Sequence, residues 1–332
     1  MKALLSREAG PPESLILADV PDPELRNGEV LIRVVACAAN FPDLLMIQDR
    51  YQVRPPRPFI PGAEVAGIVE RIGGGAGSLA TGERVMAVCN WGGMAERVAV
   101  PASRCIPVPA TVPLEEAAAL QLTYGTAYFG LRRCAHLEPA DQLLVLGAAG
   151  GVGLAAVEIG KALGAQVIGA VSSEAKATIA QSAGAEQTLL YPRGPFTEPD
   201  ARKALATLFK QVSRPSDVIL DPVGGDYAEA ALRSIAWGGR YVVVGFASGI
   251  PKIPLNVLLM KGAQIVSAPW GGVVDRDPAA FRETMAALLD LHAIGAIRPR
   301  ISLRLPLDRA SEAFARFQER AAIGKILILP GS

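Results

Sequence analysis

A glycine-rich turn stands near the middle of the chain, at Gly147, Gly150, Gly151 and Gly153. An uncharged apolar run at 143–146 precedes it, an alanine-rich run with helical spacing follows at 154–163, and a second apolar run covers 167–171. The pattern predicts a strand, a tight turn, a helix and a second strand. In such a unit the glycines let the backbone approach a pyrophosphate, and the amides at the helix start supply donors and a positive dipole end. The turn therefore predicts a dinucleotide site that includes Gly150, Gly151 and Val152.

The turn departs from the strict G-x-G-x-x-G pattern because Ala148 replaces its first glycine. An ordinary turn between a strand and a helix, in a protein without a nucleotide, is therefore the alternative interpretation. The position of the turn between two predicted strands, with a helix of suitable length between them, favours the dinucleotide.

The residues after the second strand indicate which dinucleotide is bound. NAD-specific folds place an acidic residue at the end of this strand, where it binds the ribose 2′-hydroxyl. Here Val171 occupies that position and Ser172 follows it, so no carboxylate repels a 2′-phosphate. Lys176 adds a positive charge about one turn later, although a solvated helix face would explain it alone. Glu174 is discordant, and we expect it to face solvent at the helix start. The pattern predicts NADPH.

Length and composition limit the remaining possibilities. A chain of 332 residues predicts about two domains. The formal net charge of +1 gives no basic field for nucleic acid or anionic lipid. No apolar run of about 18 residues exists, so no membrane-spanning helix is expected, and the start lacks a long apolar segment. We therefore expect a cytoplasmic protein that binds neither nucleic acid nor membrane.

Cysteine and histidine give little sign of metal or disulfide chemistry. The four cysteines are widely spaced and form no C-x-x-C pair, so neither a disulfide framework nor a zinc knuckle is indicated. The two histidines, His136 and His292, are expected at the surface rather than as catalytic bases.

Two kinds of periodicity predict the elements that must position these residues. Residues 1 to about 123 show short strands at 2–4, 30–38, 63–72, 84–87 and 95–100, separated by Gly and Pro clusters, with a helix at 114–120. This pattern favours a partly closed β-barrel. Strands then alternate with helices, at 143–147, 166–171, 187–190, 217–221, 240–245 and 263–268. Six such strands predict a doubly wound parallel sheet.

The tail after residue 271 returns to a different pattern. It predicts helices at 278–292 and 308–320 and strands at 300–305 and 326–329. We expect these strands to rejoin the N-terminal barrel. The predicted fold class is therefore α/β, with a Rossmann-type sheet domain at 124–270 inserted into a discontinuous β domain made of 1–123 and 271–332.

Motifs along nearly the whole chain resemble the medium-chain dehydrogenase/reductase superfamily, and its zinc-free NADPH:quinone oxidoreductase branch in particular. The matching stretches are 39–43 (ANFPD), 61–67 (PGAEVAG), 123–128 (TYGTAY), 147–153 (GAAGGVG), 221–224 (DPVG) and 320–325 (RAAIGK). The resemblance implies that the discontinuous domain is a GroES-like catalytic domain and that the sheet domain binds NADPH.

The same resemblance argues against a metal. Zinc alcohol dehydrogenases have a cysteine where this chain has Asn40, and a histidine where it has Ala63 beside Glu64. An amide and a methyl group cannot replace thiolate and imidazole ligands, and a catalytic zinc needs three protein ligands. The four-cysteine structural lobe of those enzymes is also missing. We therefore predict a metal-free protein.

Chemistry without a metal favours particular hydride acceptors. No Lewis acid is then available to polarise a simple carbonyl. Quinones and conjugated enones delocalise the incoming electrons, so one hydrogen-bond donor or solvent completes the reaction. The resemblance independently implies the same acceptors.

Tyr51 and Asn40 are the predicted residues of the reaction centre. In similar zinc-free reductases a tyrosine at the spacing of Tyr51 lies over the nicotinamide and is a proposed proton donor. A surface tyrosine in a proline-rich loop is the alternative. We expect Asn40 and Asp43 to act by positioning, because a loop aspartate is usually a cap or turn former.

The resemblance also implies further cofactor-binding residues. Thr126 would approach the nicotinamide end, although a helix-forming threonine in a linker is equally compatible. Tyr191 and Arg320 would complete the 2′-phosphate pocket. The remaining predicted cofactor-binding residues are Phe41, Asp43, Val223, Phe246, Ala268 and Trp270. The last three follow predicted strand ends and would act through their backbone groups, and Trp270 could equally be buried core.

Three points stay open at the level of sequence. An enoyl-thioester reductase would use the same hydride chemistry, with Arg50, Arg54 and Arg57 as candidate CoA contacts. A non-catalytic NADPH-binding or RNA-binding relative is the second alternative, against which the near-neutral charge argues. Finally, the apolar edge strand predicted at 262–268 favours a homodimer.

Overall fold

The computed structural model describes residues 1–331 as two compact units. The first unit contains 1–122, 271–289 and 299–332, and the second contains 123–270 and 290–298. Residues 290–298, which the sequence analysis assigned to the β domain, thus cluster with the sheet. Among residues 1–331, no helix is both long enough and apolar enough to cross a membrane.

The second unit is built on a six-stranded parallel sheet with the order β10-β9-β8-β11-β12-β13. Its strands are β8 (Gln142–Leu146), β9 (Gln166–Val171), β10 (Gln187–Leu190), β11 (Ser216–Asp221), β12 (Ile235–Val243) and β13 (Gln264–Ser267). The six parallel strands confirm the predicted doubly wound sheet. Successive strands run outward from β8 in one direction and then from β11 in the other. The change of direction lies between β8 and β11, where open α/β sheets bind ligands at the carboxyl ends of their strands.

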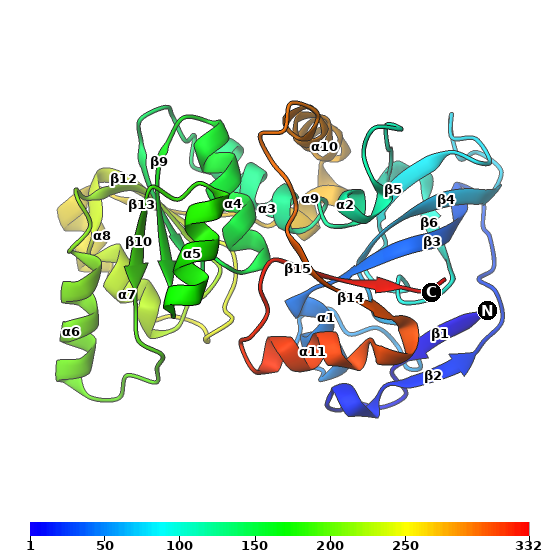
Figure 1. Cartoon of the computed structure of the whole chain (residues 1–332), viewed down its shortest axis with the longest axis horizontal. Coiled ribbons are helices and arrows are strands. Elements are labelled where there is room, and N and C mark those ends of the chain that lie inside the picture. Colours follow the sequence, from blue (N-terminus) through cyan, green and yellow to red (C-terminus); the bar gives the residue numbers. More distant parts are fainter. Residues whose placement is uncertain (332) are drawn as a thin grey trace. The chain divides into compact units, whose positions relative to one another are not determined.

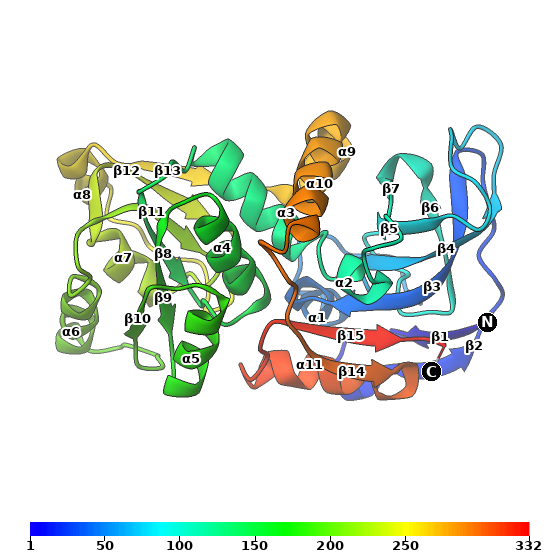
Figure 2. The ribbon, with the colours of Figure 1, turned by 45° about the horizontal axis from the view of Figure 1, so that its top comes forward.

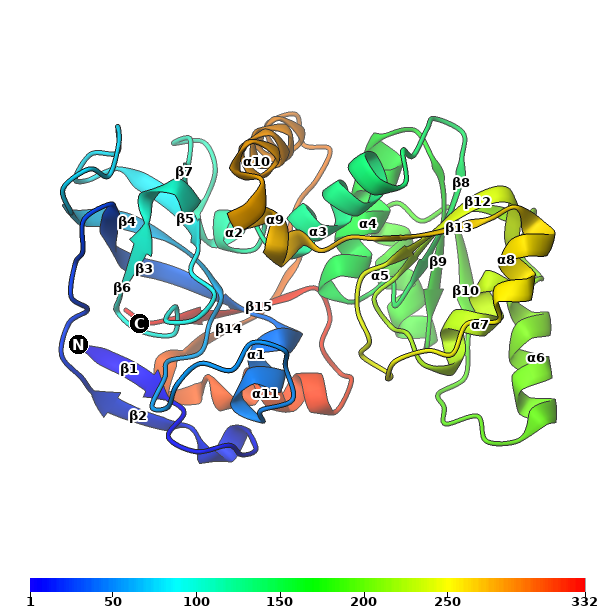
Figure 3. The same ribbon diagram turned by 180° about the vertical axis from the view of Figure 1, so that it is seen from behind.

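Helices cover both faces of this sheet. They are α3 (Thr123–Tyr128), α4 (Gly151–Ala162), α5 (Glu174–Ala183), α6 (Pro199–Phe209), α7 (Asp226–Leu232) and α8 (Leu255–Lys261). A π-helical segment, η3 (Phe129–Cys134), continues α3. Figure 1 shows α4 and α5 on one face, and Figure 3 shows α8 from the opposite side. β8 is buried along its whole length, as expected of a central parallel strand.

The first unit contains a seven-stranded sheet and a two-stranded one. Its strands are β1 (Lys2–Leu5), β2 (Ile16–Asp19), β3 (Glu29–Ala39), β4 (Glu64–Ile72), β5 (Arg84–Val88), β6 (Arg97–Pro101), β7 (Cys105–Pro107), β14 (Ile301–Pro306) and β15 (Lys325–Leu329). Figure 2 shows β15 beside β3 and β14 beyond it. The antiparallel register pairs Ile326 with Ala39 and Ile328 with Cys37. The tail therefore rejoins the N-terminal strands, as predicted.

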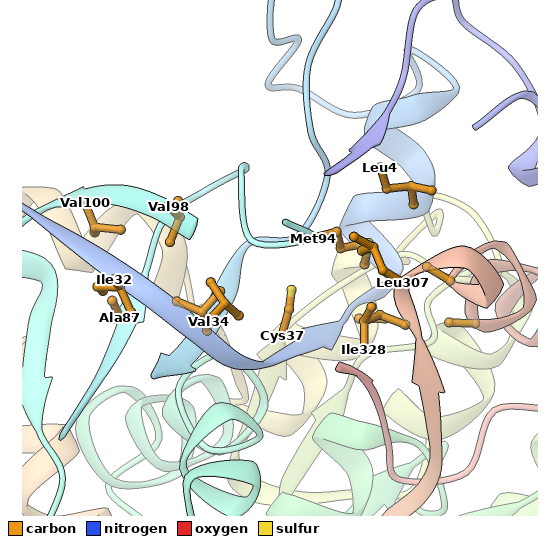
Figure 4. Packing of buried hydrophobic residues seen from close by; sticks show 14 of the residues in the cluster. Leu4, Ile32, Val34, Cys37, Ala87, Met94, Val98, Val100, Leu307 and Ile328 are labelled. Carbon is orange, nitrogen blue, oxygen red and sulfur yellow. The ribbon is translucent and has the colours of Figure 1, made fainter. Parts of the chain in front are cut away.

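The core of the first unit lies under β3. Ile32, Val34 and Cys37 pack with Met94 and Ile328, and all five side chains are buried (Figure 4). The helices of this unit are α1 (Phe41–Ile47), α2 (Leu114–Ala118), α9 (Trp270–Arg276), α10 (Pro278–Ala293) and α11 (Ser311–Gln318), together with the 3₁₀ turns η1 (Pro12–Ser14), η2 (Ala102–Arg104) and η4 (Leu307–Arg309). The first residue of α9 and the end of α10 cluster with the second unit.

Some local predictions were incomplete or wrong. The helix α1 and the strands β2 and β7 were not predicted, and the strand predicted at 240–245 starts several residues after β12 actually begins at Ile235. His292 was expected at the surface, but only 2% of it is exposed. It lies in the last turn of α10, and its Nε2 lies 2.9 Å from a guanidinium nitrogen of Arg298. The misassignment arose because burial of a helix end depends on where the following segment returns. His136 is exposed, as expected.

Candidate active site

The predicted glycine turn forms a close contact between β8 and α4. Gly147 follows β8 with φ +60°, and Gly150, the N-cap of α4, donates its N–H to the Gly147 carbonyl at 2.9 Å. A Cβ on Gly153 would lie only 2.1 Å from that carbonyl oxygen. No side chain caps α4, so the first amides of the helix, including those of Gly151 and Val152, face the turn without a competing side-chain acceptor. This cradle fits a pyrophosphate group.

The turn between β9 and α5 carries the residues expected to select the dinucleotide. Val171 is buried at the end of β9 and Ser172 is half-buried. Ser173, which the sequence analysis did not single out, is the N-cap of α5, and its Oγ accepts the Lys176 N–H at 3.4 Å. Glu174 is exposed in the first helical turn, as expected. The turn therefore has no buried carboxylate directed at a ribose.

Two neighbouring loops, which follow β11 and β12, carry Val223 and Phe246. A Cβ on Gly147 would lie 3.0 Å from Cγ2 of Val223, so the valine packs directly over the turn. The N–H of Ser248 donates to the Val223 carbonyl at 2.7 Å, which joins the two loops. Phe246 is 48% exposed.

Trp270 and Ala268 lie beyond β13, against α3. Trp270 is 2% exposed, and a Cβ on Gly125 would lie 2.4 Å from its Cε2. The indole is therefore core packing, and only the backbone around Ala268 and Trp270 could contact a ligand. Thr126, the neighbour of Gly125, is half-buried on α3. Its approach to the nicotinamide stays a prediction.

The two residues predicted to complete the phosphate pocket have contrasting environments. Tyr191 is buried, and its ring centroid lies 4.9 Å from that of Tyr227 and 6.1 Å from that of Phe209. Arg320 belongs to the first unit, where it is exposed after α11 with φ +55°. The predicted roles of Tyr191 and Arg320 in binding phosphate stay predictions.

In the first unit, Asn40 lies in a buried polar cluster with Glu64 and Lys325. The Asn40 amide donates to the Ala38 carbonyl and to Glu64 Oε1, both at 3.0 Å. The Lys325 ammonium donates to Asn40 Oδ1 and to Glu64 Oε1, both at 2.7 Å. Glu64 Oε2 accepts the Leu122 N–H at 2.8 Å. Both amide hydrogens and the amide oxygen of Asn40 are thus engaged inside the protein, which suits a positioning role.

Asp43 extends this cluster at the start of α1. Its Oδ2 accepts the Asn40 N–H at 2.8 Å, and the two residues form a capping box. Its Oδ1 is buried without a hydrogen-bond partner. Burial, together with the nearby Glu64, raises the pKa of Asp43 to about 7 against the opposing effects of the Asn40 N–H and the Lys325 ammonium. The capping pattern of Asn40 followed by Pro42 and Asp43 is a helix-start signal that could have revealed α1.

Phe41 is the first residue of α1, and Tyr51 lies in the loop after this helix. The Phe41 ring meets the Phe317 ring of α11 edge to face, with centroids 6.5 Å apart. Tyr51 is half-buried against the core of the first unit. Burial, with a smaller effect of the nearby Asp43 carboxylate, raises the pKa of the Tyr51 hydroxyl. The hydroxyl therefore stays protonated through neutral pH, as a proton donor requires.

Arg57 anchors the loop that carries Tyr51. Its guanidinium pairs with Asp49 at 2.7 Å and donates to the Ile47 carbonyl at 3.0 Å. Its Cζ lies 5.4 Å from the centroid of the Phe59 ring. A sequence-based interpretation cannot distinguish this structural arginine from one free to bind a ligand.

Binding of a metal ion would require several side chains with suitable donor atoms close together. Within residues 1–331, no group of three or more His, Cys, Asp or Glu side chains is placed to hold a metal ion. Asn40 and Ala63 supply an amide and a methyl group where thiolate and imidazole would be needed. The Asn40 oxygen is instead bonded to the Lys325 ammonium.

Comparison with known proteins agrees with the two-unit fold and the dinucleotide turn. The alcohol dehydrogenase GroES-like domain family matches residues 26–110, and the zinc-binding dehydrogenase family matches 151–291. A quinone oxidoreductase-like protein 2 homolog from Nematostella vectensis is 38% identical over 332 residues, which covers 98% of this chain and 88% of that protein.

Solved structures extend the likeness to the whole fold. A mycobacterial protein complexed with NADPH has a TM-score of 0.91 at 30% identity, covering 99% of this chain and 100% of that one. The quinone oxidoreductase of Escherichia coli complexed with NADPH has a TM-score of 0.88 at 29% identity, with the same two coverages. Together with the replaced zinc ligands, these likenesses show that the chain belongs to the zinc-free quinone oxidoreductase branch of the medium-chain dehydrogenase/reductase superfamily.

Proposed function

We propose that this protein is an NADPH-dependent reductase that transfers a hydride to quinones or related electron-poor conjugated alkenes. The observation that carries the proposal is the pairing of a glycine cradle at Gly147–Gly153 with a following strand that ends in Val171 and Ser172 rather than in an acid. Similar proteins complexed with NADPH support the cofactor.

The residues of the second unit would bind and orient the cofactor. The first amides of α4 would hold the pyrophosphate, because they lie at the positive end of the helix dipole. Ser172 and Lys176 would donate to the 2′-phosphate. Val223 and Phe246 would cover the dinucleotide from the neighbouring loops. When bound, the nicotinamide supplies the hydride.

The residues of the first unit suit an acceptor that needs no Lewis acid. A quinone that receives a hydride delocalises its negative charge and then needs one proton to become the hydroquinone. Tyr51 would supply this proton from its hydroxyl, and the tyrosinate would regain it from solvent. Asn40 and Asp43 would fix the start of α1, and thereby the loop that carries Tyr51.

The function is tested by following NADPH oxidation with 1,4-benzoquinone, 9,10-phenanthrenequinone, a simple enone and crotonyl-CoA. We expect turnover with the quinones, with or without the enone, and little with crotonyl-CoA. Turnover with crotonyl-CoA alone would replace the proposal by an enoyl-thioester reductase. Tight NADPH binding without any turnover would favour a non-catalytic relative.

The arginines considered for CoA binding do not favour the enoyl-thioester alternative. Arg57 is occupied by Asp49 and by backbone carbonyls, and the Arg50 guanidinium donates to Gln48 at 3.3 Å. A CoA phosphate that recruited Arg57 would have to break these bonds and loosen the Tyr51 loop. Arg54 is exposed and is a weak argument by itself.

Tyr51→Phe tests the proposed proton donor. We expect kcat with quinones to fall by about tenfold or more, with the Kd of NADPH unchanged, since a positioned general acid contributes about 10²–10⁴-fold and solvent replaces part of it. Leu45→Ala, on α1, controls for a general loosening of this segment. Unchanged turnover in Tyr51→Phe would remove the tyrosine from the chemistry.

We also propose a homodimer that forms through the β13 edge of the sheet. β13 is the last strand in the sheet order, so one side of its backbone lacks a neighbouring strand within the described chain. Exposed apolar side chains occur on β13 and on the two preceding elements: Ile265 is 39% exposed, and Trp237 of β12 and Leu259 and Met260 of α8 are each at least 72% exposed. A second copy that pairs antiparallel with β13 would cover both the edge and these side chains. Cytoplasmic location stays a prediction.

A further inference from the structure

A buried aspartate at the end of β11 holds the loop that packs over the glycine turn. Asp221 is 2% exposed, and its Oδ1 accepts the N–H groups of Val223 at 2.7 Å and Gly224 at 2.9 Å. Its Oδ2 accepts the hydroxyl hydrogen of Tyr241 at 2.6 Å, and Tyr241 is itself 1% exposed. An ionised carboxylate accepts hydrogen bonds only, so its two oxygens match the three donors that surround it.

The loop held in this way is also joined to the loop after β12. Ser248 N donates to the Val223 carbonyl, and Gly225 N donates to the Gly249 carbonyl, both at 2.7 Å. The loops approach so closely that a Cβ on Gly224 would lie 2.6 Å from the Gly249 oxygen. The backbone carbonyl of Asp221 in addition accepts the N–H of Val244 at 3.0 Å. Hydrogen bonds therefore join the two loops to each other and, through Asp221, to the sheet.

The joined loops contact the glycine turn through the side chain of Val223. β11 lies beside β8 in the sheet, so the ends of the two strands are neighbours. Val223 packs over Gly147, and a Cβ there would approach it to 3.0 Å. Phe246 and Val223, both predicted cofactor-binding residues, belong to the joined loops. If their carboxylate tie is lost, the residues that flank the cradle lose their fixed position.

We propose that Asp221, held by Tyr241, is a positioning residue for the dinucleotide: it fixes the joined loops 222–225 and 246–249 in the conformation that receives the cofactor. The inference rests on the proposed NADPH binding. The loops are ordered before the ligand arrives, so their conformational entropy is not lost during binding and the affinity is higher. Asp221 would not touch the reacting atoms.

We call Asp221, Tyr241 and the two loop amides that Asp221 binds the clamp. Burial of the Asp221–Tyr241 pair determines which group keeps the proton. Burial raises the pKa of the Asp221 carboxyl, while the Tyr241 hydroxyl and the two loop amides oppose this shift. Burial and the neighbouring carboxylate raise the pKa of Tyr241 well above its ordinary value, so the hydroxyl keeps its proton and remains the donor. The three hydrogen bonds therefore depend on one another, and removal of Tyr241 leaves a buried carboxylate oxygen without its donor.

The clamp is tested by isothermal titration of the full-length protein with NADPH and, separately, with NADH. In Asp221→Ala we expect both Kd values to rise by about tenfold, because two loop amides lose their buried acceptor. The rises should be equal, since the loops do not face the 2′-phosphate, and kcat at saturating NADPH should stay within about twofold. Asp221→Asn should bind almost as wild type does, because its amide oxygen still accepts from the loop and its NH₂ group can donate to Tyr241.

Two further variants separate positioning from general stability. Tyr241→Phe should weaken binding of both dinucleotides by about threefold, because the loop amides keep their acceptor but the carboxylate loses a donor. Gln142→Ala removes a buried polar side chain at the amino end of β8, where Gln142 bonds Ser213 and Arg214. This control should lower the melting temperature without changing either Kd.

The outcomes are distinguishable. If wild type binds NADPH and Asp221→Ala binds it equally well, the clamp is refuted and the proposed function stands. If Asp221→Ala does not fold, an unchanged Kd in Tyr241→Phe refutes the clamp in the same way. Equal weakening in Asp221→Asn and Asp221→Ala would also contradict it, because the amide preserves the hydrogen bonds. Wild-type protein that fails to bind NADPH refutes the proposed function and the clamp together.

Discussion

At the scale of single residues, buried polar side chains form a cluster in the first unit. Asn40, Glu64 and Lys325 satisfy one another's hydrogen-bonding groups inside the first unit. A buried ion pair of this kind adds little net stability, because the cost of removing both charges from water offsets their attraction. Removal of one partner would leave a buried charge, which is destabilising by about 3–5 kcal/mol. These residues are therefore better probed through neighbours whose charge can be removed without breaking the cluster.

Asp43 is such a neighbour, and it predicts a pH-dependent stability. Its pKa is about 7 in the folded protein against 3.8 for an ordinary aspartate, so between these values the folded state holds a proton that the unfolded state has lost. Stability must then fall as the pH rises from about 4 to 7. Asp43→Asn, which cannot ionise and still accepts the Asn40 N–H, should be more stable than wild type above pH 7 by up to about 4 kcal/mol, since each unit of pKa shift corresponds to about 1.4 kcal/mol.

The measurement is urea unfolding from pH 4 to pH 8.5. The difference between Asp43→Asn and wild type should shrink toward pH 4, because wild type gains stability as its folded state binds a proton that the unfolded state binds only near pH 4. The exposed Asp308, changed to asparagine, gives the matched control and should show no such trend. A difference that stays constant with pH would contradict a raised pKa for Asp43.

Lys176 predicts the selectivity for the dinucleotide. Lys176→Glu should raise the KM for NADPH by about tenfold or more and leave the KM for NADH nearly unchanged, because a carboxylate would repel only the 2′-phosphate. Steady-state kinetics with both cofactors measures the effect. Lys203→Glu changes an exposed lysine on α6 and serves as the charge control. Equal increases for the two cofactors would remove Lys176 from the phosphate site.

At the scale of elements, the position of α4 relative to the turn after β8 depends on a very close contact at Gly153. Helix and turn approach so closely that only hydrogen fits at Gly153, where a Cβ would come within 2.1 Å of a backbone oxygen. Overpacking of this kind forces the backbone to shift, typically at about 1–3 kcal/mol. The amides of α4 would then no longer point at the pyrophosphate position.

Gly153→Ala is therefore expected to lower stability by about 1–3 kcal/mol and to weaken NADPH binding by more than tenfold. Denaturant unfolding and calorimetric titration measure the two effects. Gly271→Ala is the matched control, because it also lies in a helix but a Cβ there would meet nothing within 4 Å. Normal NADPH affinity in Gly153→Ala would show that the close contact is not needed for binding.

At the scale of the whole molecule, the exposed edge of β13 predicts the state of assembly. Light scattering should give twice the chain mass of 34.7 kDa. Ile265→Lys places a charge on the edge strand and should shift the mass toward that of a monomer. Ile294→Lys, at another exposed apolar residue, should leave the mass unchanged. A wild-type mass near 34.7 kDa would reject the homodimer.

The sequence by itself determined the parts of the protein that depend on local pattern. Apolar runs of strand length, separated by helical spacing, were sufficient to predict the six parallel strands, because the central strands β8, β9 and β11 are buried over most of their length and must be apolar there. The glycine turn and the missing acid after β9 could likewise be read directly, since phosphate binding uses neighbouring backbone groups. The helix α1 could also have been predicted from its capping residues Asn40 and Asp43 and from Pro42 in its first turn.

Only the tertiary structure decided which distant side chains meet. Lys325 reaches Asn40 because β15 pairs with β3, and no spacing in the sequence indicates that register. Tyr241 reaches Asp221 for the same reason, through the pairing of β12 with β11. His292 was misjudged because its burial depends on the return of the chain at Arg298. Such contacts follow from sheet pairing and chain return over long separations, whereas local pattern reports only on neighbours along the chain.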